Sequence, residues 1–161
     1  EVGLEHTTAW MSLGQVTEII AMFLLGGLLL KRGLKTIFTI GLAFGVLRFA
    51  CCALNSKGWL LGGVVLHGCS FTMVYITAQI YLDQQVEAAW RARAQALMSL
   101  VTGGVGNLIG YLGTGWWFAA NTTATSTHWP IFWGGLAATV ALVLVYFLAA
   151  YQGERTEGRN R

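Results

Sequence analysis

The fold is decided by residues 9–54, which read AWMSLGQVTEIIAMFLLGGLLLKRGLKTIFTIGLAFGVLRFACCAL. Two apolar runs, 9–30 and 34–54, flank the short basic break Lys31-Arg32-Gly33. Each run reaches the length of about 20 residues that a helix, rising about 1.5 Å per residue, needs to cross a hydrocarbon core of about 30 Å. The stretch therefore predicts two transmembrane helices joined by a tight, positively charged turn.

The rest of the chain repeats this pattern, with further apolar runs over residues 58–82, 94–119 and 131–151. These runs are continuously apolar, whereas a membrane β-barrel alternates apolar and polar residues in segments of about ten. The chain of 161 residues is 55% hydrophobic with a mean hydropathy of +0.60, and only 11% of its residues are charged. Soluble domains carry about a quarter charged residues. We predict an all-α, multi-pass membrane helix bundle of five helices.

The composition also excludes several classes of function. The three cysteines, Cys51, Cys52 and Cys69, form neither an even disulfide framework nor a CxxC zinc pattern. The formal charge of +3 is too small and too dispersed to indicate a nucleic-acid partner. No nucleophile–base pair or metal cluster is visible in the sequence, so we expect no enzyme activity and no cofactor.

The basic residues predict the orientation of the five helices. They gather in the first break, in the third break and in the C-terminal tail, namely at Lys31, Arg32, Lys35, Arg91, Arg93, Arg155, Arg159 and Arg161. The second and fourth breaks contain only Lys57. Because cytoplasmic loops are enriched in Lys and Arg, we expect residues 152–161 to be a cytoplasmic tail and residues 9–151 to be the membrane domain.

An odd number of spans then places residues 1–8 outside the cytoplasm. This segment begins with Glu1 and contains no basic and apolar signal sequence that would carry it across a membrane. We therefore expect residues 1–8 to be the remnant of an extracytoplasmic loop. On this view an earlier span is missing, and the chain is the tail end of a longer protein.

Three ionisable residues share one layer of the predicted bundle. Glu18 and His67 each lie about nine residues from the outer end of a helix, hence about 13 Å deep, and Arg48 is about 9 Å deep with a long side chain. Such residues cost about 2.5–3.5 kcal/mol each on insertion scales, so their coincidence indicates function. We predict that Glu18, Arg48 and His67 form a charge network in the outer half of the membrane.

Polar and aromatic residues extend this layer into a candidate binding site. Gln15 and Glu18 are three residues apart and share one helical face. A stripe at helical spacing comprises His67, Phe71, Tyr75 and Gln79, and Thr72 borders it. Such a stripe is unfavourable against lipid, so we expect it to line a cavity for a polar, ring-bearing solute. Gln15 and Glu18 would bond the solute, and Phe71 or Tyr75 would stack on it.

Structural roles remain open for the same residues. Glu18 could pair with Arg48 to hold two helices together, because buried charges usually need a partner. His67 could be a hydrogen-bonded packing residue, and Phe71 could face lipid or the helix core. Four tryptophans fit an aromatic belt at the membrane surface rather than a binding site, namely Trp116, Trp117, Trp129 and Trp133.

Several phrases occur in the order found in one transporter family. LGQVTE at residues 13–18 and LKRGLK at 30–35 are followed by LRF at 47–49, LHG at 66–68 and QIYLD at 79–83. The phrases end with AQAL at 94–97 and GNLIGY at 106–111. Together they resemble the second half of the nucleoside:proton symporters of the major facilitator superfamily.

This resemblance implies a fold and a function. The five predicted spans would match helices eight to twelve of a twelve-helix transporter of a cell inner membrane, with the N-terminal half as the missing partner in the lipid bilayer. Gln15 and Glu18 match positions that contact the nucleoside, and Glu18 also suits proton coupling, with the proton as coupling ion. Thr72 stands where the family usually has Asp, so a transporter of another polar solute, such as a sugar, and a non-transporting membrane assembly protein remain alternatives.

Overall fold

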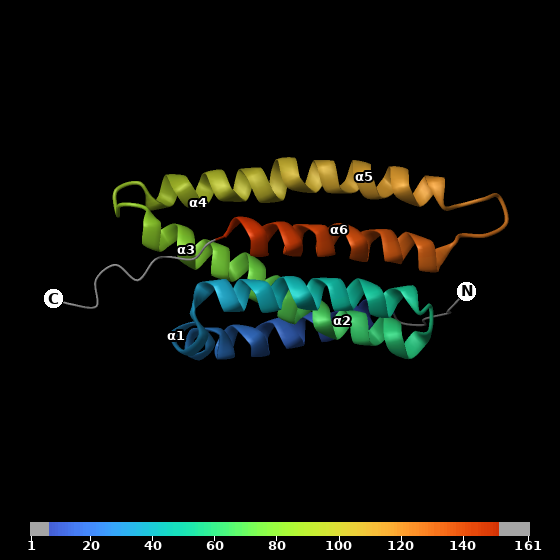
Figure 1. Ribbon diagram of the computed structural model, residues 1–161, viewed down its shortest axis with the longest axis horizontal. Coiled ribbons are helices and arrows are strands. Elements are labelled where there is room, and N and C mark those ends of the chain that lie inside the picture. The colour runs from blue at the N-terminus through green and yellow to red at the C-terminus, as the bar shows by residue number, and fades with distance from the viewer. Residues whose placement is uncertain (1–6, 152–161) are drawn as a thin grey trace.

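The computed structural model describes residues 7–151, and every regular element in that range is a helix (Figure 1). In chain order the elements are α1 (Thr7–Ala53), α2 (Lys57–Phe71), η1 (Thr72–Ile76), α3 (Thr77–Gln85), α4 (Arg91–Ser99), η2 (Leu100–Gly106), α5 (Asn107–Ala120) and α6 (Trp129–Ala150). Residues 1–6 of the predicted segment 1–8 and the predicted tail 152–161 lie outside the described residues. The predicted all-α class is confirmed for the part of the chain that the structure describes.

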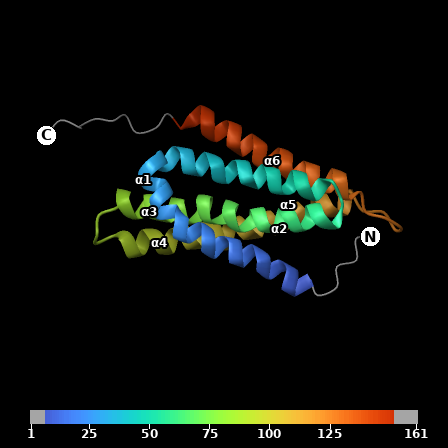
Figure 2. The same cartoon turned by 90° about the horizontal axis from the view of Figure 1, so that it is seen from below.

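The element α1 contains a sharp reversal at Gly33. Gly33 has φ 73° and ψ 164°, a left-handed φ that glycine adopts without a steric penalty. Two arms, residues 7–32 and 34–53, extend from this turn toward the same end of the bundle and run antiparallel to each other, as the blue and cyan segments in Figures 1 and 2 show. We call them the first and second arms of α1. The predicted basic turn at Lys31-Arg32-Gly33 is thus the point where α1 folds back.

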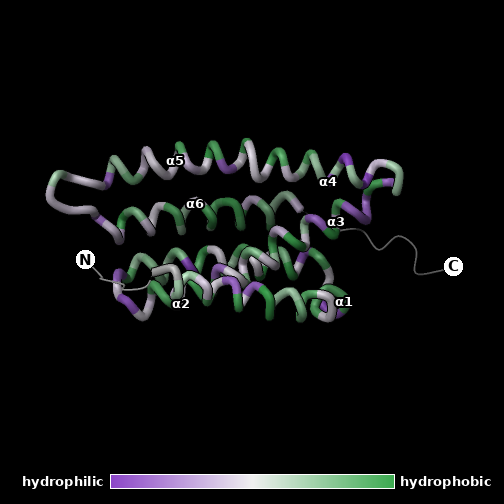
Figure 3. Tube along the Cα trace, turned by 180° about the vertical axis from the view of Figure 1, so that it is seen from behind, coloured by the Kyte–Doolittle hydropathy of each residue, from purple (hydrophilic) through white to green (hydrophobic). Residues whose placement is uncertain are grey.

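The predicted number of five helices is not matched. Four helices in the described residues are long and apolar enough to cross a membrane, namely Ala9–Ala53, Lys57–Gln85, Arg91–Ala120 and Trp129–Ala150. The difference arises at Gly33, because the helical segments on both sides of it continue without an intervening loop. Figure 3 shows hydrophobic residues along the four helices and hydrophilic residues mainly at the turns between them.

Two of the long helices contain a π-helical stretch near the middle. The segment η1 separates α2 from α3, and η2 separates α4 from α5. A π-helical turn widens the backbone and is frequent at functional sites. In both cases the helix continues beyond the π segment, so the long apolar helix is locally distorted but not broken.

Glycines bring both arms of α1 into close contact with α2. A Cβ atom at Gly68 would lie 2.2 Å from the carbonyl oxygen of Gly14 on the first arm. A Cβ atom at Gly63 would lie 2.7 Å from Cys52 Sγ on the second arm. The hydroxyl of Thr17 donates to the carbonyl oxygen of Val65 at 2.8 Å, which adds a polar contact to the first of these interfaces. Small residues at such crossings allow helices to approach closely in lipid.

The helix formed by α4, η2 and α5 is the least covered part of the bundle. None of its most apolar 18-residue window is buried within the described structure. Near the C-terminal end of α5, Trp117 Nε1 donates to the carbonyl oxygen of Phe132 at 3.1 Å. A Cβ atom at Gly135 would lie 2.7 Å from Trp117 Nε1, so the Trp117 ring packs directly against the backbone of Gly135. This contact joins α5 to α6.

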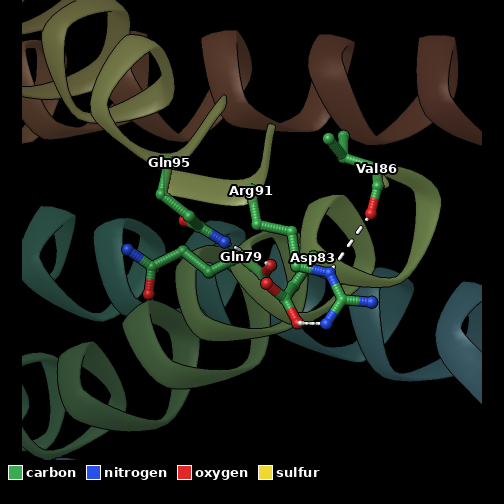
Figure 4. A network of polar contacts seen from close by, with 5 residues as sticks. All are labelled: Gln79, Asp83, Val86, Arg91 and Gln95. Atoms are coloured by element: carbon green, nitrogen blue, oxygen red, sulfur yellow. Dashed lines mark hydrogen bonds and ion pairs between the residues drawn. The ribbon is translucent and has the colours of Figure 1, made fainter. Parts of the chain in front are cut away.

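At the other end, polar contacts fix the turn between α3 and α4 (Figure 4). Gln95 Nε2 donates to the carbonyl oxygen of Gln79 at 3.0 Å, and Arg91 Nε donates to that of Val86 at 3.2 Å. Arg91 Nη1 also lies 3.7 Å from Asp83 Oδ2. The two helices are therefore tied together beside their connecting turn.

Candidate functional site

A cavity of about 390 Å³ lies between the first arm of α1, its second arm, α2 and α6. The lining residues are Met11, Gln15, Glu18, Arg48, Cys52, Gly63, Val64, His67 and Trp133. We call this the polar cavity. Its volume falls within the range of about 300–1,000 Å³ that is usual for small-molecule sites.

The three ionisable residues that share one predicted layer all line the polar cavity. Glu18 lies on the first arm, Arg48 on the second arm and His67 on α2. Gln15 lies one helical turn before Glu18 and lines the cavity as well. These residues come together because α2 packs against both arms of α1, so that residues at similar heights along the three segments lie close to one another.

Arg48 and His67 form a hydrogen-bonded pair. Arg48 Nη1 contacts His67 Nδ1, and a guanidinium can only donate hydrogen bonds. His67 Nδ1 must therefore accept, which places the ring proton of a neutral imidazole on Nε2. The Arg48 guanidinium also lies 4.3 Å from the ring centroid of Phe49, a cation–π distance. The pair presents an N–H donor at Nε2 on the wall of the polar cavity.

Glu18 does not pair with Arg48. In the described part of the chain the one ion pair joins Arg91 to Asp83, and neither Glu18 nor Gln15 has a side-chain hydrogen bond there. The structure therefore does not support Glu18 as a static partner of Arg48, whose guanidinium contacts His67 in the described residues. Glu18 is half-buried, and its carboxylate is available to a solute or a proton in the cavity.

The other predicted solute contacts lie away from the polar cavity. The Phe71 and Tyr75 rings stack with centroids 5.1 Å apart, and Phe71 lies 6.2 Å from the His67 ring. These three residues form one aromatic column, as their spacing predicts. Thr72 is 0% exposed, and its hydroxyl donates to the backbone carbonyl of Glu18 at 3.3 Å. Thr72 thus fastens η1 to the first arm, since its side chain points between the helices.

Trp133 and Cys52 are among the lining residues of the polar cavity that sequence patterns did not assign to the site. Trp133 was expected in an aromatic belt, yet it lines the polar cavity and stacks on Phe49 with centroids 6.0 Å apart. Cys52 lines the cavity beside Arg48. The spacing of four residues between Arg48 and Cys52 was a usable signal, because it places both on one helical face. No local pattern indicates which face of α6 Trp133 occupies.

Sequence comparison identifies relatives of the whole chain. Residues 1–156 match the sequence profile of a family described as Nucleoside H+ symporter. The putative nucleoside transporter YegT of Escherichia coli is 29% identical over an alignment that covers 98% of this chain and 40% of YegT. The nucleoside permease NupG of Escherichia coli is 24% identical over 92% of this chain and 37% of NupG. The chain thus spans about two fifths of the length of these relatives.

Structural comparison gives the same relationship at the level of the fold. The crystal structure of the nucleoside transporter NupG superposes with a TM-score of 0.83 at 24% identity, over 92% of this chain and 38% of that one. A NupG mutant superposes with a TM-score of 0.84. The match therefore extends to the helix arrangement that forms the polar cavity. With a family profile covering nearly all of its residues, the chain belongs to the nucleoside H+ symporter family.

Proposed function

We propose that this chain forms part of a proton-coupled nucleoside transporter that works by alternating access. The observation that carries the proposal is the polar cavity, which Gln15 and Glu18 line together with the Arg48–His67 pair. The relatives are described as nucleoside transporters and permeases, which supports the substrate class. The rest of such a protein would complete the cavity from the side that the described helices leave open.

The groups around the polar cavity complement a nucleoside. Gln15 offers a donor and an acceptor, Glu18 offers acceptors for sugar hydroxyls, and His67 Nε2–H offers a donor for a base carbonyl. Trp133 provides an aromatic surface in the cavity, and Phe71 and Tyr75 extend the aromatic wall beyond His67. We propose Thr72 as a packing residue beneath this site, because its hydroxyl is used by the Glu18 carbonyl.

We propose Glu18 as the proton-coupling group. A coupling carboxylate must exchange its proton with whichever side of the membrane is open and must respond to the bound substrate. Two features of Glu18 support this role: it lines the cavity and has no ion-pair partner within residues 7–151. His67 is a poorer carrier, because protonating its Nδ1 would remove the acceptor of the Arg48 hydrogen bond.

We further propose that the two arms of α1 cross the membrane separately, which gives five spans. The second arm and the first arm each have the length of a span, and the basic turn at Gly33 would then face the cytoplasm with the α3–α4 turn and the C-terminus. The membrane domain would cover residues 9–151, with residues 1–8 outside and 152–161 inside, in the inner membrane of the cell. This arrangement corresponds to helices eight to twelve of a major facilitator transporter.

Transport by the full-length protein in proteoliposomes tests the proposal. With an imposed pH gradient, radiolabelled uridine should accumulate inside, and excess unlabelled nucleoside should compete while glucose should not. The Glu18→Gln variant should lose accumulation driven by the gradient yet retain exchange of labelled for unlabelled nucleoside, because an amide cannot carry the proton.

A matched variant keeps this test specific. Glu87 is an exposed carboxylate in the turn between α3 and α4, so Glu87→Gln removes the same charge outside the cavity and should leave accumulation unchanged. Normal accumulation by Glu18→Gln would overturn the role of Glu18. Uptake of a sugar in place of nucleosides would favour the alternative substrate, and no uptake of any solute would favour an assembly protein.

A further inference from the structure

A second hollow, of about 250 Å³, lies beside the turn of α1 at Gly33. Its lining residues are Arg32, Gly33, Leu34, Lys35, Tyr81, Gln84 and Tyr151. We call it the basic hollow. In Figure 1 the turn of α1, the turn between α3 and α4 and the C-terminal end of α6 all lie at this end of the bundle. Since the long apolar helices begin and end here, the hollow lies at the boundary between lipid and water.

The basic hollow carries uncompensated positive charge. Its lining includes Arg32 and Lys35 and no carboxylate. The acidic residue next in sequence to its wall, Asp83, faces Arg91 at 3.7 Å. Among the described residues, Arg32 has neither an ion pair nor a hydrogen bond from its side chain. The hollow therefore attracts anions.

The remaining groups make the basic hollow suitable for a phosphate. Lys35 Nζ lies 5.7 Å from the ring centroid of Tyr151, which holds the ammonium at the wall without neutralising it. Tyr81 and Gln84 add neutral hydrogen-bond donors. A guanidinium fork, an ammonium and neutral donors together match the oxygens of a phosphate. The hollow is below the size of about 300–1,000 Å³ usual for drug-sized ligands, which favours a headgroup over a nucleoside.

The surroundings favour a phosphate that belongs to a lipid. On the first arm of α1, shortly before the hollow, Leu30 is 91% exposed and Phe23 is 86% exposed. These residues leave an apolar flank along which acyl chains can lie while the headgroup occupies the hollow. Basic pockets between spanning helices at a membrane surface recognise anionic headgroups in this way.

We propose that the basic hollow binds the phosphate of an anionic membrane lipid, with Arg32 and Lys35 as its cationic contacts. The proposal uses the membrane placement of the helices but does not depend on nucleoside transport. The hollow and the polar cavity have no lining residue in common, so loss of lipid binding and loss of transport are separate outcomes.

Native mass spectrometry of the full-length protein in detergent tests the site. The protein is titrated with palmitoyl-oleoyl-phosphatidylglycerol, and the affinity of the first bound lipid is compared with that of palmitoyl-oleoyl-phosphatidylcholine. The anionic lipid should bind about fivefold more tightly, because one unpaired basic residue near the surface contributes about 1 kcal/mol and a tenfold change in affinity corresponds to about 1.4 kcal/mol. The double variant Arg32→Gln/Lys35→Gln should abolish this preference.

Two further variants make the result decisive. Lys31→Gln/Arg93→Gln removes two exposed cations from the same end of the bundle but outside the hollow, and should keep the preference. Arg32→Lys/Lys35→Arg keeps both charges and should also keep it, which controls for misfolding. If the two Gln double variants lost the preference for the anionic lipid equally, the preference would come from diffuse surface charge, and the proposed site would be wrong. Displacement of the lipid by soluble glycerol 3-phosphate at comparable concentration would overturn the assignment to a lipid.

Discussion

At the scale of single residues, the Arg48–His67 pair determines what the polar cavity offers to a solute. The guanidinium fixes the imidazole in one tautomer and one orientation, so His67 is a donor at Nε2 and not an acceptor. On the proposed function, we expect the site to bind a solute that has an acceptor at this position, whereas a solute with only a donor would place two N–H groups against each other. An unsatisfied polar group in a buried site costs about 1–3 kcal/mol.

This tautomer can be tested with two amide substitutions at His67. Glutamine places its amide near the position of Nε2, and asparagine places its amide near the position of Nδ1. If Nε2–H donates to the substrate, His67→Gln should retain uridine binding within about threefold and His67→Asn should weaken it about tenfold, the loss expected for one hydrogen bond to the substrate. Equilibrium binding of labelled uridine to the full-length protein provides the measurement, and the opposite order would contradict the assigned tautomer.

A second residue-scale prediction concerns Thr72, which stands where the resemblance implies an Asp. The Thr72 side chain is fully buried against the backbone carbonyl of Glu18, so a carboxylate there would face an acceptor. Thr72→Asp should therefore lower the stability by about 1–3 kcal/mol or more, whereas Thr72→Ser, which keeps the hydroxyl, should be close to wild type. Thermal unfolding in detergent measures both variants. An unchanged midpoint for Thr72→Asp would show that this side chain can reach water or a partner.

At the scale of helices, close backbone contact between α1 and α2 creates the polar cavity. Gly68 lies against Gly14 and the start of the Glu18 peptide, so this crossing sets the position of Gln15 and Glu18 relative to His67. The contact depends on the absence of a side chain, because two of the three nearest atoms, the Gly14 carbonyl oxygen and the Glu18 amide nitrogen, are backbone and cannot rotate away. The geometry of the candidate site is thus a consequence of one small-residue crossing.

Two alanine substitutions on α2 separate this effect from helix propensity. Gly68→Ala would place a Cβ 2.2 Å from the carbonyl oxygen of Gly14, so we expect about 1–3 kcal/mol of destabilisation and loss of uridine binding. Gly62→Ala, on the same helix, meets nothing within 4 Å and should be neutral or slightly stabilising in the described structure. Thermal midpoints of the two variants in detergent should differ clearly. Equal midpoints would contradict the close crossing.

The sequence predicted the helices well and the site only in part. Apolar runs of spanning length are a local property, so the positions of the long helices follow from counting residues. The layer of Glu18, Arg48 and His67 also follows from counting, because depth depends only on rise per residue. The partner of Arg48 and the burial of Thr72 depend instead on how helices rotate about their axes. That rotation is fixed by contacts between distant residues such as Gly68 and Gly14.

At the scale of the whole molecule, the uncovered helix of α4, η2 and α5 indicates where further protein surface belongs. Its glycines Gly103, Gly110 and Gly113 have nothing within 4 Å of an added Cβ in the described structure, whereas Gly41 on the second arm is in tight contact. Small residues in membrane helices usually mark a close helix contact. The relatives are more than twice as long as this chain, so this face is where we expect their remaining helices to pack.

The last prediction concerns the topology of the whole chain. The described residues form four long apolar helices, whereas the proposed arrangement has five membrane spans, and the two counts differ only because α1 turns back at Gly33. In a full-length protein without other cysteines, a single cysteine at Lys31, Asn55 or Thr123 reports the side on which each turn lies. If both arms of α1 cross the membrane, a membrane-impermeant maleimide added to intact cells should label Asn55→Cys and Thr123→Cys but label Lys31→Cys only after permeabilisation. The turn at Lys31 carries basic residues, which favour the cytoplasmic side, so we expect a cysteine at this position to be protected in intact cells. Labelling of Lys31→Cys in intact cells would show that the turn at Gly33 does not reach the cytoplasm, and both the five-span arrangement and its orientation would then fail.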